Sequence, residues 1–267
     1  MGRMFGWLMV AVLAGALAGC KPSDAIKQGK VIDNGTKTEE RAATPSAPLD
    51  PATLGTVRGE VHFSGKPPAR VKIDMSQDPV CSMMGGDNFS EQYVVKDGGL
   101  ANVYVYVKSG PAAAMSAPAV SAAPVVLDQV GCKYVPHVVG VMRGGAVEFR
   151  NSDGTMHNIH TMPTVSGNAA VNVSQGAQGA PDTERFDAPE LMMPVRCNNH
   201  PWMNAFINVS ATPFFAVTDA EGKFEIKGLP AGTYTLGAVH EKLGEQTMTV
   251  TVKAQETGKA EFTYSIK

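Results

Sequence analysis

The residues best suited to chemistry in this 267-residue chain lie close together in its last third. A thiol, an imidazole and a thioether follow one another as Cys-x2-His-x2-Met, at Cys197, His200 and Met203. A soft thiolate, an imidazole and a weak thioether suit a copper ion that cycles between Cu(I) and Cu(II), and a blue-copper centre adds a second imidazole. Upstream, His157 and His160 offer that imidazole. The residues therefore predict a redox metal centre built from two separated segments.

Short β-strands are expected to position these residues. Residues 57–63 alternate between apolar and polar side chains, and residues 101–107 are rich in β-branched and aromatic side chains. Comparable patterns occur at residues 147–149, 214–217, 223–226, 233–236, 246–252 and 260–264. Turn-forming residues separate the later strands, and helical periodicity is scarce. The chain is therefore predicted to be all-β, with the strands arranged as a sandwich or barrel.

Two stretches are predicted to be long connections. Residues 109–124 are nearly all Ala, Pro, Ser and Gly, and residues 164–182 are rich in Gly, Ala, Asn and Gln. Connections of this length without structure of their own are usually functional covers or disordered segments, and the composition leaves both open.

The segments that carry the candidate ligands resemble cupredoxins over residues 128–210. Residues 138–160, ending in His-Asn-Ile-His, resemble the cupredoxin strand and loop that deliver the first copper histidine. Residues 197–203 resemble the ligand loop in its short, amicyanin-like form, although Asn-Asn replaces the frequent Thr/Ser-Pro and residues 164–182 look like an insertion. The resemblance implies a Greek-key β-barrel. In it, type 1 copper is held by His157, Cys197, His200 and an axial Met203.

The same resemblance implies roles for neighbouring residues. Asn158 would brace the ligand loop by hydrogen bonding, which orients metal ligands and tunes the metal. His200 would form a partly exposed edge through which electrons leave. His160 lies three residues beyond His157 and is expected to point away from the same ion, as a surface residue or an indirect support.

A second resemblance surrounds the first. Residues 59–65 and 216–234 resemble the start and the later half of a carboxypeptidase-regulatory-like, transthyretin-type β-sandwich, a structural or binding module without catalysis of its own. Either the cupredoxin-like segment is inserted in that sandwich or the two domains lie in series. The whole arrangement is similar to bacterial secreted proteins labelled methylamine-utilisation or plastocyanin-like.

The N-terminus predicts export and anchoring. An apolar run too short to span a bilayer ends in Leu-Ala-Gly-Cys, which looks like a bacterial lipoprotein cleavage site with Cys20 as the lipidated residue. The predicted organisation is a signal peptide at 1–19, a flexible tether at 20–55, sandwich at 56–110, copper domain at 111–211 and the rest of the sandwich at 212–267. The protein is thus expected on the periplasmic or cell-surface face of a bacterial membrane, held by its lipid alone.

Two cysteines remain once Cys20 and Cys197 are assigned. Cys81 and Cys132 would most often form a disulfide in an oxidising compartment. A second metal site is the main alternative, because Cys-Ser-Met-Met at residues 81–84 also sets soft ligands side by side. Two free thiols are the third.

The expected function follows from the copper site. No catalytic constellation stands out, so the protein is not expected to be an enzyme. The formal net charge is −2 without a basic cluster, so nucleic acid is not an expected partner. We predict single-electron transfer between a donor and an acceptor redox protein. The alternatives are copper binding or delivery, and a non-redox β-sandwich binding module. In the delivery alternative, four methionines would add soft ligands: Met83, Met84, Met192 and Met193.

Overall fold

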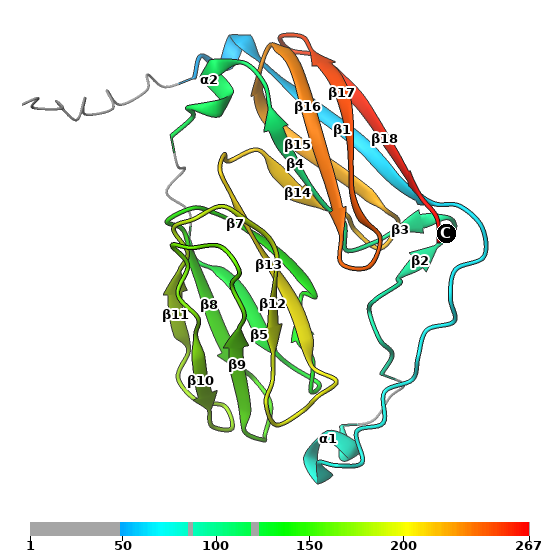
Figure 1. The fold of residues 1–267 in the computed structure, drawn as a ribbon, viewed down its shortest axis with the longest axis vertical. Coiled ribbons are helices and arrows are strands. Elements are labelled where there is room, and N and C mark those ends of the chain that lie inside the picture. The colour runs from blue at the N-terminus through cyan, green and yellow to red at the C-terminus, as the bar shows by residue number, and fades with distance from the viewer. Residues whose placement is uncertain (1–48, 85–87, 119–122, 267) are drawn as a thin grey trace, which may run out of the picture. The chain divides into compact units, whose positions relative to one another are not determined.

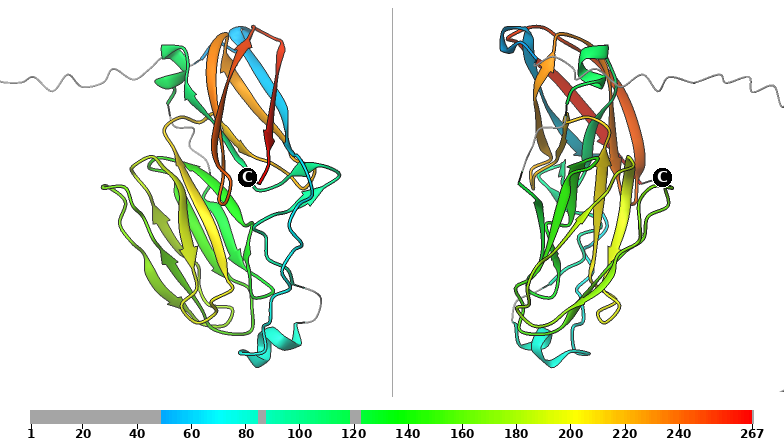
Figure 2. Two further views of the ribbon diagram at one scale, coloured as in Figure 1. Left: turned by 45° about the vertical axis from the view of Figure 1, so that its right-hand side comes forward. Right: turned by 90° about the vertical axis from the view of Figure 1, so that its left-hand side faces the viewer.

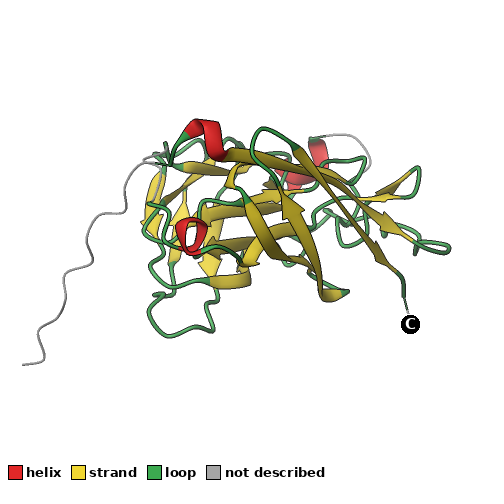
Figure 3. Ribbon diagram, turned by 90° about the horizontal axis from the view of Figure 1, so that it is seen from above, coloured by secondary structure: helices red, strands yellow, loops and turns green. Residues whose placement is uncertain are grey.

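The computed structural model describes residues 49–84, 88–118 and 123–266 of the chain. Strands dominate this part, with a few short helices between them (Figure 3). The all-β prediction is confirmed. The predicted signal peptide, Cys20 and most of the predicted tether lie outside the described residues. No helix within the described ranges is long and apolar enough to cross a membrane.

One pair of sheets, here called the sandwich body, draws strands from both ends of the described chain (Figure 1). Its first sheet has the order β15-β1-β3-β2, with β18 against β1, and its second has the order β14-β4-β16-β17. The strands are β1 (Leu54–Phe63), β2 (Val95–Lys96), β3 (Gly99–Leu100), β4 (Tyr104–Ser109), β14 (Phe215–Val217), β15 (Lys223–Pro230), β16 (Gly232–His240), β17 (Gly244–Val252) and β18 (Thr257–Tyr264).

A second pair of sheets, the ligand-bearing body, is formed by the stretch between β4 and β14. Its sheets have the orders β10-β9-β12-β13-β7 and β11-β8-β5-β6. The strands are β5 (Val125–Gln129), β6 (Tyr134–Val135), β7 (Val138–Met142), β8 (Ala146–Asn151), β9 (His157–Thr161), β10 (Asn172–Gln175), β11 (Asp182–Arg185), β12 (Glu190–Arg196) and β13 (Asn204–Ser210). Strands β12 and β13 run side by side as an antiparallel pair (Figure 2).

Strand pairing makes the ligand-bearing body an insertion. Early strand β1 pairs with the late strands β15 and β18, and β4 pairs with β14 and β16. The sandwich body therefore closes only when both ends of the described chain meet. Each body has a separate apolar core: Val57, Val61 and Leu236 are buried in the sandwich body, and Phe149 and Ile207 in the ligand-bearing body.

Two predicted boundaries differ from the structure. The fold begins before the predicted end of the tether at residue 55, because Leu49 packs against the sandwich core, η1 (Pro51–Thr53) follows and β1 begins at Leu54. Helix α2 (Ala112–Met115), predicted within the copper domain at 111–211, packs on the sandwich core through Ala114. The ligand-bearing strands thus begin only at β5.

A further difference bears on the metal centre. Residues 73–84, which contain α1 (Pro79–Met83) and are here called the cover segment, were predicted to belong to the sandwich at 56–110. Instead Met75 and Cys81 are buried in the core of the ligand-bearing body. The chain leaves the sandwich body after β1, packs on the other body and returns at β2.

Both predicted connections contain secondary structure. Helix α2 lies in residues 109–124, and β10 lies in residues 164–182, where it pairs with β9 along the edge of a sheet. Strand β10 is mostly polar and lacks the apolar alternation by which a sequence indicates a strand. Its Gln175 is buried, and its side-chain amide offsets the cost of burial by donating to the Phe149 carbonyl at 2.9 Å.

Acid sensitivity of the sandwich body is expected from His240, the last residue of β16. The side chain is 1% exposed, and burial lowers its pKa to about 4. The unfolded chain takes up this proton near pH 6.5, so stability should fall as the pH drops from 6.5 to 4, by up to about 3 kcal/mol. His240→Gln should flatten that dependence in urea unfolding at pH 7, 5 and 4, whereas His62→Gln, at a side chain that is 41% exposed, should not. Equal pH slopes in all three proteins would contradict this assignment.

Candidate metal centre

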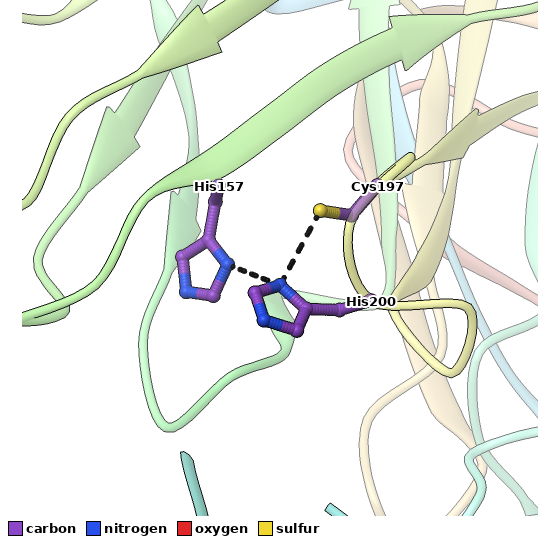
Figure 4. A group of neighbouring side chains, drawn as sticks. All are labelled: His157, Cys197 and His200. Atoms are coloured by element: carbon purple, nitrogen blue, oxygen red, sulfur yellow. Dashed lines mark hydrogen bonds between the residues drawn. The ribbon is translucent and has the colours of Figure 1, made fainter. Parts of the chain in front are cut away.

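Three donor atoms from two separate segments of the chain meet in the ligand-bearing body (Figure 4). Nδ1 of His200 lies 2.9 Å from Nδ1 of His157 and 3.5 Å from Sγ of Cys197. The three residues form a group that could hold a metal ion, with ligand atoms within 4.8 Å of one another. His157 is fully buried, and His200 and Cys197 are 3% and 4% exposed. The structure thus brings three of the four predicted ligands together.

The antiparallel pairing of β9 with β12 places these side chains at one end of the sheet. His157 is the first residue of β9, and Cys197 follows the last residue of β12. A tight loop then returns the chain to β13. Its closing contacts are the Met203 N–H donating to the His200 carbonyl at 2.9 Å and the Cys197 N–H donating to the Met203 carbonyl at 3.3 Å. These backbone hydrogen bonds fix the conformation of the loop that carries Cys197 and His200.

A carboxylate holds the far nitrogen of each imidazole. Nε2 of His157 lies 2.8 Å from Oδ2 of Asp153, and Nε2 of His200 lies 3.1 Å from Oδ2 of Asp78. A neutral imidazole carries one proton, and a carboxylate acceptor favours that proton on Nε2. The two Nδ1 lone pairs are then free to bind a metal.

Asp153, which holds Nε2 of His157, is buried and accepts several hydrogen bonds. Asp153 is 3% exposed and accepts the backbone N–H groups of Gly131 and Cys132, each at 2.8 Å. Burial raises the pKa of Asp153, but hydrogen bonds from His157 and from these backbone N–H groups lower it overall. Burial lowers the pKa of His157, and the contacts with Asp153 and Cys197 outweigh it and raise the pKa to about 9.

The support under His200 is also ionised. The pKa of Asp78 is lowered to about 2, chiefly by the backbone N–H of Cys81, with burial opposing the shift and hydrogen bonds from His200 and Thr155 adding to it. Both imidazoles are therefore backed by a negative charge.

The Cys197 thiol is prepared for metal binding. Burial raises its pKa, but hydrogen bonds from His157 and from the backbone N–H groups of Asn199 and Asn158 outweigh this and lower the pKa to about 7. Since the thiolate is the form that binds metals, this environment favours ligation.

Asn158 makes contacts of the kind that the cupredoxin resemblance implies. Its Oδ1 accepts the backbone N–H of Asn198 at 3.3 Å, and its Nδ2 donates to the Val173 carbonyl at 2.8 Å. The side chain thus joins the ligand loop to β10. His160 points elsewhere, with Nδ1 2.9 Å from Oδ1 of Asn198, and is outside the donor group. The predicted axial ligand Met203 is 1% exposed and packs in the same core cluster as Cys197.

The predicted exposure of His200 is wrong. Its ring is enclosed by Asp78 on one side and by Trp202, whose ring centroid lies 5.1 Å away. Sequence reasoning missed both carboxylates. The position of Asp153 four residues before His157 could have indicated the first, but Asp78 lies 122 residues before His200 and carries no sequence signal.

Cys81 and Cys132 form a disulfide, with Cα atoms 5.7 Å apart, next to the donor group. Sγ of Cys81 lies 3.9 Å from Nε2 of His200. The alternative of a second soft-metal site with free thiols does not match this bond. Cys197 is the free cysteine among the described residues.

The donor set fits copper chemically. One thiolate and two imidazole nitrogens, with a buried thioether nearby, are soft and borderline ligands that both copper oxidation states accept. The carboxylates that hold the histidines are the kind of support that metal-binding histidines require.

Comparisons with known proteins cover parts of the chain. Residues 196–265 match the carboxypeptidase regulatory-like domain family, which confirms the resemblance predicted for residues 216–234 and spans β13 to β18. No match was found among curated protein sequences.

Among solved structures, the chain is similar to an amicyanin in its Cu(I) form, at 21% identity over 40% of this chain and 98% of that one, with a TM-score of 0.30. A purple cupredoxin from Nitrosopumilus maritimus shares 20% identity over 32% of this chain and 99% of that one, with a TM-score of 0.27. A Cu-containing nitrite reductase from Thermus scotoductus shares 26% identity over 35% of this chain, with a TM-score of 0.30. The chain spans only 25% of that reductase.

The disulfide predicts a thiol count. In a chain that starts at residue 21, a thiol reagent should find one thiol, Cys197, and only after unfolding, because that side chain is buried. Cys197→Ser should leave none under the same conditions without reductant. Three thiols in the unfolded, unreduced protein would show that Cys81 and Cys132 are not joined.

Asp153→Asn should weaken both the fold and the metal site. A single amide oxygen cannot serve the three donors that the carboxylate accepts, so the metal-free protein should lose about 1–3 kcal/mol of stability. Metal affinity should fall about 10–100-fold, as is common when a hydrogen-bond partner of a ligand is removed. Urea unfolding and competitive Cu(II) titration measure the two effects. The exposed Asp187→Asn is the control, and equal behaviour of both variants would contradict the role of Asp153.

Proposed function

We propose that this chain is an extracytoplasmic type 1 copper protein that passes single electrons between two redox partners. One observation carries the proposal: two imidazole Nδ1 atoms and one thiol Sγ converge in a buried site. Both histidines are fixed through Nε2 by carboxylates, so the donor atoms are aligned before a metal binds. Copper, when bound, supplies a one-electron couple between Cu(I) and Cu(II).

The residues of the chain perform three tasks in such a centre. Cys197, His157 and His200 bind the ion, and the burial of all three excludes water from it. Asp153 and Asp78 hold the imidazole rings in one orientation. Because the donors are held by strands, a closed loop and buried hydrogen bonds, a change of charge at the site requires little movement of the protein.

The proposed setting is a membrane surface. Cys20 would carry the lipid, and the residues after it would let the folded part reach its partners on the periplasmic or cell-surface face. Anchoring would raise the effective concentration of the carrier near a membrane-bound donor or acceptor. We propose no catalytic role and no nucleic-acid partner.

Copper delivery is a weaker proposal on this structure. Met193 is fully buried in the core, and Sδ of Met192 accepts a hydrogen bond from the amide of Asn208 at 3.8 Å, so neither is placed as a free soft ligand. Met83 and Met84, which are 77% and 36% exposed, remain available on the cover segment. A non-redox module would not need the complete donor set.

The optical and EPR spectra of the Cu(II)-loaded protein test the proposal. We expect intense absorption at about 600 nm from a copper–thiolate bond, with small hyperfine splitting. Cys197→Ser should abolish both signals. His160→Gln should keep them, because His160 lies near the loop but outside the donor group. A protein that holds only Cu(I), or an ordinary Cu(II) spectrum that is indifferent to Cys197, would reject electron transfer and favour copper delivery.

A further inference from the structure

We infer that Asp78 is a positioning residue that completes the metal centre from outside the ligand-bearing body, and that the Cys81–Cys132 disulfide holds it in place. The inference rests on the proposed copper site and goes beyond it, because Asp78 belongs to the cover segment rather than to the strands and loops that carry the ligands.

The two oxygens of Asp78 have different partners. Oδ1 caps helix α1 by accepting the backbone N–H groups of Val80 at 2.7 Å and Cys81 at 3.0 Å. Oδ2 accepts the Thr155 hydroxyl at 3.1 Å and lies 3.1 Å from Nε2 of His200. The helix cap therefore fixes the carboxylate, and the remaining oxygen is directed at the imidazole.

The disulfide connects the supports of both histidines. Cys81 follows Asp78 by three residues, and its partner Cys132 donates its backbone N–H to Oδ2 of Asp153. That oxygen is also the one that holds Nε2 of His157. One covalent bond thus ties the cover segment to the loop under the other ligand.

Other contacts keep the cover segment on the ligand-bearing body. Met75 is 7% exposed and packs in that body's core, and the Ser82 hydroxyl donates to the Met75 carbonyl at 2.9 Å. Thr155, which bonds Asp78, lies in the loop between β8 and β9, two residues before His157. The cover segment is therefore held through Met75, through helix α1 and through the loop between β8 and β9.

This arrangement has a chemical consequence for the metal. The negative charge of Asp78 beside Nε2 makes His200 a stronger donor and favours Cu(II) over Cu(I), because the more positive ion gains more from it. The cover also closes the edge of His200 to solvent, so a bound ion should exchange slowly. Loss of Asp78 should change both properties without removing a ligand.

Asp78→Asn in the full chain is the test, with Asp74→Asn as its matched control. Asp74 lies on the same segment, is exposed and is bonded locally by Ser76, whose backbone N–H donates to its Oδ1 at 2.9 Å. Asp78→Asn should lower the Cu(II) affinity relative to the Cu(I) affinity by about tenfold, measured as a raised reduction potential. It should also speed the removal of copper by a chelator. Asp74→Asn should match the wild type.

Nitrogen NMR of the metal-free protein gives a readout that a merely structural role would not change. In the wild type the neutral His200 ring should carry its proton on Nε2. In Asp78→Asn that ring should sample both tautomers, while the His157 signals stay as in the wild type. The inference is overturned if Asp78→Asn matches Asp74→Asn in tautomer, potential and copper release, or if it lowers thermal stability alone. A wild type that binds no copper but shows the fixed tautomer would reject the proposed function and not the positioning role.

The disulfide has a separate test. Cys81→Ala with Cys132→Ala should release copper faster than the wild type and should loosen the His200 tautomer in the same direction as Asp78→Asn. If this double variant does not fold, reduction of the folded wild type by a dithiol replaces it. In that reaction two dithiol electrons and two protons convert the bond to two thiols, and the dithiol becomes a disulfide. Unchanged copper release after verified reduction would overturn the part assigned to the disulfide.

Discussion

The site depends on holding two buried imidazoles in one orientation, with Nε2 of each ring hydrogen-bonded to a carboxylate and Nδ1 directed at the other donor atoms. A buried polar nitrogen without a partner costs roughly 1–3 kcal/mol in a protein interior. The ligand-bearing body therefore pairs Nε2 of His157 with Asp153 and Nε2 of His200 with Asp78. These pairs satisfy the buried nitrogens and at the same time aim the two Nδ1 atoms at the Cys197 thiol.

The two carboxylates come from different parts of the chain. Asp153 comes from the loop before β9, which leads directly into His157. Asp78 comes from a segment that leaves the sandwich body after β1 and returns to it at β2. Since β1 and β2 both belong to the sandwich body, the cover segment is held at both ends as well as by its disulfide.

Contacts between the bodies add to this arrangement. Nε2 of His137 lies 2.7 Å from Oε1 of Glu241, and both side chains are 3% exposed. Nδ1 of the same histidine lies 3.2 Å from the carbonyl of Asn204, the residue that follows Met203. Tyr104, Val138 and Val239 form a small apolar cluster from both bodies. The sandwich body thus contacts His137, which in turn contacts the backbone next to the ligand loop.

The sequence by itself determined the all-β class and pointed to His157, Cys197 and His200, which the structure brings together. Strand alternation and ligand spacing are local, so residues 57–63 indicated β1, and Cys-x2-His-x2-Met indicated a loop that closes on one ion. Asn158 was named on the resemblance of residues 138–160 to cupredoxins, and in the structure it accepts the backbone N–H of Asn198. Strand β10 was missed, since an edge strand that is mostly polar gives no alternating pattern.

Only the tertiary structure decided the insertion, the burial of His200 and the role of Asp78. Each depends on contacts between residues far apart in the chain, such as β1 with β18 and Asp78 with His200. No local pattern records such a contact, because its geometry exists only after both bodies have folded. Ligands that are close together in the sequence, such as Cys197 and His200, could be predicted. A contact between distant residues, such as Asp78 with His200, required the structure.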